Sequence, residues 1–207
     1  MILKFAIALL FSALGFIPVQ AGDFSAAQVK PGKTSSRYQK SVQAFHQIPN
    51  IELVTMNGQK IKFSQLVYSG QPVILDFIFA SCPTFCPLLS ATFAKAQQLA
   101  ADEDIKPKFI SITIDPENDT PKKLKAYAEK FHAGPDWHFL TGEFDQITAL
   151  QQAFSAFYGD KISHRALIFV NSGQPGSDWL RLEGFSSASN LLAEYRNFMA
   201  KTRAGTE

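Results

Sequence analysis

The sequence predicts an α/β fold in which helices flank a central mixed sheet that begins with an N-terminal β-hairpin. Strand-like and helix-like apolar patterns alternate along the chain, and their order is β-α-β-α followed by β-β-α. No internal repeat or second core follows. The chain has 207 residues, 46% of them hydrophobic, which is enough for one globular domain with its own core.

The first residues have the features of a secretory signal peptide. Lys4 precedes the apolar run 5–17, and Val19-Gln20-Ala21 offers small residues for cleavage. We expect cleavage after Ala21, which gives a soluble protein on the periplasmic side of the membrane. A retained membrane anchor is the alternative, although the run falls short of the roughly 20 apolar residues of a spanning helix.

Residues 22–47 are predicted to form a flexible arm, because they are rich in Ser, Lys, Gln and Ala and contain Pro31-Gly32. The domain itself is predicted over residues 48–202. Its first elements are the strands 51–55 and 60–63, which flank Asn57-Gly58. This dipeptide tolerates positive φ and favours a tight turn, so the pair is predicted to be an edge hairpin.

The next element is a strand that leads to a cysteine pair. Residues 72–80 (PVILDFIFA) form a nearly continuous apolar run, as in a strand buried on both faces. A helical apolar face begins after Pro87, so Cys82 and Cys86 are predicted at a strand-to-helix junction.

The remaining elements complete the alternation. Residues 108–114 (KFISITI) are a predicted strand, and Asp119-Thr120-Pro121 begins a helix that runs to about Phe131. Strands follow at 137–140, 166–170 and 178–183, and helices at 144–157 and 188–199. This order, with a cysteine pair after the central strand, fits a thioredoxin-like fold.

Charge excludes one class of function. The formal net charge is +2, and the basic residues are scattered rather than clustered. We therefore expect no nucleic-acid partner.

The two cysteines indicate a reactive or metal-binding pair rather than a structural disulfide. A bond between residues four apart closes a very small loop and restricts the unfolded chain little. A position in the first turn of a helix favours the thiolate. If both residues were helical, their Cβ atoms would lie about 5–6 Å apart, against about 3.8 Å in a disulfide. This spacing favours joint capture of a metal ion.

A histidine supplies a third candidate ligand. His164 precedes the predicted interior strand 166–170, and in a thioredoxin-like fold the residue at that point faces the cysteine pair. Position alone leaves a ligand and an ordinary surface histidine both open. Two thiolates and an imidazole suit Cu(I), whereas structural zinc takes four ligands.

Four segments together resemble one known family. They are FIFASCPTFCP (77–87), SITIDPENDTP (111–121), HFLTG (138–142) and His164 before an apolar strand. Over about residues 48–195 the sequence resembles the Sco/SenC family of copper-binding cytochrome oxidase assembly factors. The resemblance implies that Cys82 and Cys86 are thiolate ligands and a redox pair, and that His164 is the third ligand of Cu(I) or Cu(II).

The resemblance also implies a role and partners. It implies an exported copper chaperone that supports metalation of the dinuclear copper centre of cytochrome c oxidase. The expected partners are the copper-bearing oxidase subunit or another exported cuproprotein, and other copper carriers or thiol reductants. Asp115 would lie near the site, either as an acid that tunes its charge or as a loop cap. Ser163 and Arg165 depart from the family pattern around the histidine, and Arg165 adds a permanent cation there.

Two enzyme classes are alternatives. A thiol-disulfide oxidoreductase that reduces copper-ligand or other exported cysteines would use the same cysteine pair but has no need of the imidazole. A peroxiredoxin fits poorly, because Leu75 and Phe79 stand where that class has proline and threonine.

Overall fold

The computed structural model describes residues 38–45, 47–103 and 105–204. The predicted signal peptide and most of the predicted arm lie outside these ranges. Eight strands form one mixed sheet in the order β1-β8-β7-β4-β5-β6-β2-β3. The strands are β1 Tyr38–Gln43, β2 Glu52–Thr55, β3 Lys60–Lys62, β4 Val73–Ile78, β5 Lys108–Thr113, β6 Trp137–Thr141, β7 Leu167–Asn171 and β8 Trp179–Gly184.

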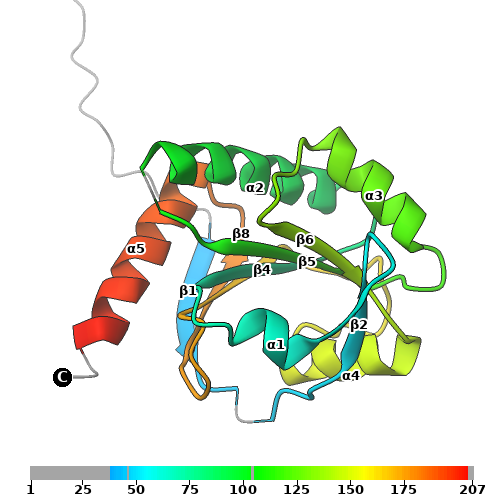
Figure 1. The fold of residues 1–207 in the computed structure, drawn as a ribbon, viewed down its shortest axis with the longest axis horizontal. Coiled ribbons are helices and arrows are strands. Elements are labelled where there is room, and N and C mark those ends of the chain that lie inside the picture. The colour runs from blue at the N-terminus through cyan, green and yellow to red at the C-terminus, as the bar shows by residue number, and fades with distance from the viewer. Residues whose placement is uncertain (1–37, 46, 104, 205–207) are drawn as a thin grey trace, which may run out of the picture. The chain divides into compact units, whose positions relative to one another are not determined.

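Helices cover both faces of the sheet (Figure 1). They are α1 Phe63–Val67, α2 Phe85–Asp102, α3 Pro121–Lys130, α4 Phe144–Ala153 and α5 Ala188–Ala204. On one face Phe93 of α2 packs against Phe109 and Trp137, and α5 lies beside α2. On the other face Phe154, directly after α4, packs against Phe77 and the α1 residue Phe63. The α/β fold predicted from the alternation of elements is confirmed.

Strand β4 lies in the middle of the sheet and is buried along its whole length. It pairs in parallel with β5 and antiparallel with β7, with Asp76 opposite Ile168. The carboxyl end of β4, where the cysteine loop starts, therefore lies beside the amino end of β7. This arrangement decides which loops meet at the candidate site.

The predicted hairpin is confirmed at the far edge of the sheet. Strands β2 and β3 pair antiparallel, and Gly58 in their turn has φ +79°, a conformation that favours glycine. The hairpin joins the sheet through β2, which pairs with β6.

Three elements differ from the sequence-based expectation. Tyr38–Gln43 forms strand β1 on β8, so the expected flexible arm does not extend over these residues. The short helix α1 was not expected at all. Helix α4 ends at Ala153 rather than near residue 157, because Ser155 takes φ +50° and leaves the helical conformation.

Within the part of the chain that the structure describes, no helix is both long enough and apolar enough to cross a membrane.

Candidate functional site

The two cysteines lie where β4 gives way to α2. Cys86 is in the first turn of α2, while Cys82 lies in the loop before the helix, so the two are not both helical. The Cys82 backbone N–H donates to the Phe79 carbonyl oxygen at 3.1 Å and turns the loop back toward β4. Both thiols are free, with Cys86 fully buried and Cys82 8% exposed.

The two thiols differ in acidity. Burial alone raises the pKa of Cys82, but hydrogen bonds from the backbone and side chains of Cys86 and Thr84 outweigh it and lower that pKa. For Cys86, burial is the main cause of a strongly raised pKa, and the neighbouring Cys82 and Asp76 raise it further. Cys82 is therefore the thiol that ionises first, and Cys86 keeps its proton.

This difference predicts selective alkylation of the folded, reduced protein. Iodoacetamide at pH 7.5 is expected to modify Cys82 at least about tenfold faster than Cys86, because only a thiolate that the reagent can reach reacts. Peptide mass spectrometry after a time course measures both rates. In urea the two cysteines should react at similar rates, and equal rates in the folded protein would contradict the assignment.

A buried carboxylate fixes the loop that carries Cys82. Asp119 accepts hydrogen bonds from the Ala80 backbone N–H at 2.9 Å and from the Thr113 hydroxyl at 2.6 Å. The sequence places the start of helix α3 at Asp119-Thr120-Pro121, and within this segment Thr120 is the cap, because its hydroxyl accepts from the Lys123 N–H. Asp119 instead ties the segment 111–121 to the cysteine loop. The burial of Asp119 reveals this role, and the sequence pattern alone did not.

Asp115 lines the same cavity as His164 and joins two loops. Its carboxylate forms an ion pair with Lys161 at 2.6 Å and accepts a hydrogen bond from the Asn118 amide at 2.9 Å. Burial alone would raise the pKa of Asp115, but the bonds from Lys161 and Asn118 lower it. Lys161 also lies 6.0 Å from the Phe79 ring centroid. The ion pair thus connects the β5–α3 loop to the loop that carries His164.

His164 is buried, with only 4% of its surface exposed, and lies beside the end of β4. Its Nε2 atom is 2.8 Å from the carbonyl oxygen of Phe77, five residues before Cys82. A carbonyl oxygen only accepts, so Nε2 carries the proton and Nδ1 keeps its lone pair. Among the residues that the structure describes, Nδ1 has no hydrogen-bond partner. Burial lowers the pKa of His164 despite the bond to Phe77, so the ring is neutral at pH 7.

The three predicted ligands do not form a closed metal site. Among the described residues, no group of three or more His, Cys, Asp or Glu side chains lies close enough together to hold a metal ion. The fold brings the two cysteines together and places His164 at the same end of β4. Two thiols and a neutral imidazole are ligand types that suit Cu(I), and the thiols alone suit disulfide exchange.

The sequence analysis missed a polar cluster beneath the cysteine pair. Asp76, fully buried on β4, accepts a hydrogen bond from the Ser111 hydroxyl at 2.6 Å. The Ser111 oxygen in turn accepts from the Trp137 indole N–H at 2.9 Å. The signal was available, because an aspartate within an otherwise apolar strand is rarely buried without a reason.

Comparison with known proteins identifies the family. A family model described as SCO1/SenC matches residues 40–175. The SCO1 protein homolog of Bacillus subtilis is 34% identical over 143 residues, which cover 65% of this chain and 70% of the relative. A protein of Stutzerimonas stutzeri named a putative copper-binding protein is 38% identical over 107 residues, about half of each chain.

A solved structure agrees in fold. The structure of BsSco, described as a member of the Sco family of cytochrome c oxidase assembly proteins with a disulfide switch, aligns with a TM-score of 0.61 and 25% identity. The alignment covers 72% of this chain and 91% of BsSco. The thioredoxin-like fold expected from the sequence is the fold of these relatives, and the chain belongs to the SCO1/SenC family.

Proposed function

We propose that this protein is an exported copper chaperone that binds one copper ion through the thiolates of Cys82 and Cys86 and through Nδ1 of His164. The observation that carries the proposal is the state of His164. Its ring is fixed by the Nε2–H bond to Phe77, and its buried Nδ1 has a free lone pair beside the strand that leads to two free thiols. A buried acceptor without a partner costs free energy, which a metal ion would recover.

Copper as the cargo is supported by ligand chemistry and by relatives. Thiolates and imidazole suit copper in both oxidation states. Binding of Cu(II) depends more on the imidazole nitrogen than binding of Cu(I) does. A relative from Stutzerimonas stutzeri is named a putative copper-binding protein. Because the three ligands do not yet form a cluster, we infer that copper binding moves the His164 loop or the cysteine loop by a small distance.

The receiving protein is inferred from the family. BsSco is described as belonging to cytochrome c oxidase assembly proteins. We therefore propose delivery to the copper-bearing subunit of cytochrome c oxidase or to another exported cuproprotein. The predicted cleavage after Ala21 would release the protein on the periplasmic side, where such an acceptor receives its metal.

A copper titration with matched histidine variants tests the proposal. We expect wild-type protein, reduced, to bind one copper ion, and His164→Ala to keep some Cu(I) binding and its thiol reactivity. The variant should lose the Cu(II)–thiolate absorption in the visible range. His138→Gln is the control, because His138 lies half-buried on β6 rather than beside β4. Unchanged Cu(II) absorption in His164→Ala would remove His164 from the site.

The acidity difference between the cysteines favours thiol-disulfide exchange as a second candidate function. The Cys82 thiolate would attack a partner disulfide, the partner's second sulfur would leave as a thiolate, and Cys86 would release the partner by closing the Cys82–Cys86 bond. Two electrons pass to the partner. Reduction of an oxidised copper-site dithiol by His164→Ala at the wild-type rate would favour this function over copper delivery.

A further inference from the structure

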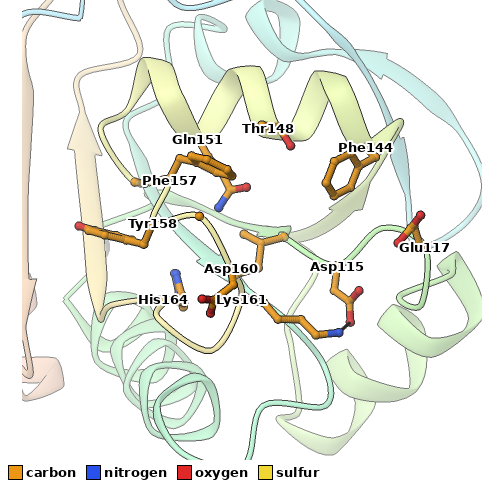
Figure 2. A pocket seen from close by; sticks show the side chains of 13 residues that line it. Asp115, Glu117, Phe144, Thr148, Gln151, Phe157, Tyr158, Asp160, Lys161 and His164 are labelled. Carbon is orange, nitrogen blue, oxygen red and sulfur yellow. Dashed lines mark hydrogen bonds and ion pairs between the residues drawn. The ribbon is translucent and has the colours of Figure 1, made fainter.

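A cavity of about 200 Å³ adjoins His164 on the side of helix α4 (Figure 2). Three segments line it: the loop after β5, one side of α4 and the loop that carries His164. The volume is below the range of roughly 300–1,000 Å³ that is usual for sites of drug-sized ligands and cofactors. A cavity of this size suits one side chain of a docking polypeptide.

The wall formed by α4 carries an amide that faces the cavity. Gln151 is 6% exposed and lines the cavity. Figure 2 shows this amide extending from α4 into the cavity, with His164 and Lys161 across from it. The amide thus opens onto the cavity, where it can donate to or accept from a polar group that enters.

The charges of the cavity favour a cation. Carboxylates line it at Asp115, Glu117 and Asp160, and Lys161 is the one basic side chain among the lining residues. Lys161 is already paired with Asp115. Arg165, which follows His164, is paired with Glu183 and lies over the Tyr158 ring, so its charge is also balanced. The lining therefore carries an excess of negative charge.

Aromatic side chains complete the entrance. Phe144 is 52% exposed and Phe157 41% exposed, and both line the cavity. Ile162, on the same loop as His164, is 86% exposed. Aromatic faces attract cations, and exposed apolar side chains around a polar pocket are typical of a protein interface.

We propose that this cavity receives an arginine side chain of the protein that exchanges copper or thiols with Cys82, Cys86 and His164. A guanidinium offers five donors and a flat face, which match the Gln151 amide oxygen, the carboxylates and the aromatic walls. The proposal rests on the proposed function, because the cavity is a docking point only if partners meet the protein at His164.

The test uses the copper-free, reduced protein and N-acetyl-arginine methylamide as the probe. Titration followed by amide NMR is expected to shift signals of the lining residues with millimolar affinity. The citrulline analogue has the same shape without the charge and should bind about tenfold more weakly. Gln151→Leu and the surface variant Glu117→Gln should each weaken the arginine probe about five- to tenfold. Lys122→Gln, on α3 and outside the lining, is the control.

The outcomes separate this proposal from copper binding. Copper stoichiometry of Gln151→Leu should equal that of the wild type, because Gln151 is not a proposed ligand. The arginine assignment would be overturned if the arginine and citrulline probes bound equally tightly, or if the NMR signals of the lining residues did not shift. Tighter binding of a third probe, N-acetyl-lysine methylamide, would also overturn it. Those results would leave the copper titration of His164→Ala unaffected.

Discussion

Replacing either Cys82 or Cys86 by alanine is expected to abolish tight copper binding by the reduced protein. In the proposed site two thiolates hold the ion, and neither one thiolate with an imidazole nor the imidazole alone is a strong site for Cu(I). The affinity should fall by several orders of magnitude. Competition with a coloured Cu(I) chelator measures it, and copper analysis after gel filtration gives the stoichiometry.

The controls show whether such a loss is specific. Ser81→Ala changes an exposed neighbour of Cys82 and should bind copper like the wild type. Cys86 is fully buried, so Cys86→Ala leaves a small cavity, and its thermal unfolding must be recorded beside the copper titration. A folded variant of either cysteine that keeps wild-type affinity would exclude the dithiolate site.

The core elements of the fold were predictable because burial leaves a strong pattern in the sequence. Strands β4, β5 and β7 are buried along their whole length and mainly apolar, and α3 begins with Thr120 followed by Pro121, a common start of a helix. The hairpin β2–β3 was predicted from its Asn-Gly turn.

The elements that were missed depend on tertiary contacts. Strand β1 is exposed at four of its six positions and so has no alternating apolar pattern, although Val42 pairs with Leu180 of β8. Helix α1 has five residues and no side-chain cap at Lys62. Neither segment forms alone, because a short helix or a polar edge strand needs the rest of the sheet.

The candidate site was predictable in its residues but not in its electrostatics. The cysteine spacing and the apolar strand before it located the pair at the strand-to-helix junction. The unequal acidity of Cys82 and Cys86 depends on burial and on hydrogen bonds from Thr84, which no sequence pattern contains. The same holds for His164, whose free nitrogen is identified only by its bond to Phe77.

Asp76→Asn is expected to change how the stability of the protein depends on pH. Burial raises the pKa of Asp76 from 3.8 to about 7, although the hydrogen bond from Ser111 lowers it in part. Within the described ranges of the chain, the second carboxylate oxygen of Asp76 has no hydrogen-bond partner. The folded state therefore binds this proton more tightly than the unfolded state. The contribution of protonated Asp76 to the unfolding free energy is therefore fully present below about pH 4. It is lost as the pH rises to about 7.

The size of this effect is large for one side chain. Each pKa unit corresponds to about 1.4 kcal/mol, so ionisation of Asp76 in the core costs on the order of 4 kcal/mol of unfolding free energy at neutral pH. Asparagine has the same shape, keeps the bond from Ser111 and carries no charge. The variant should thus be more stable than the wild type at pH 8, where the wild type carries a buried charge, although the burial of unpaired amide N–H groups reduces this gain. Near pH 4 the variant should be the less stable protein.

Urea unfolding from pH 4 to 8.5 measures this dependence. Other carboxyl groups titrate in the same range, so the quantity of interest is the difference in unfolding free energy between wild type and variant at each pH. Asp102→Asn, on the exposed side of α2, serves as the control and should leave the wild-type curve unchanged. A constant difference in unfolding free energy between wild type and Asp76→Asn would mean that the buried carboxyl does not titrate.

The charge of Asp76 also adds to the raised pKa of Cys86. Iodoacetamide should therefore modify Cys86 faster in Asp76→Asn than in the wild type.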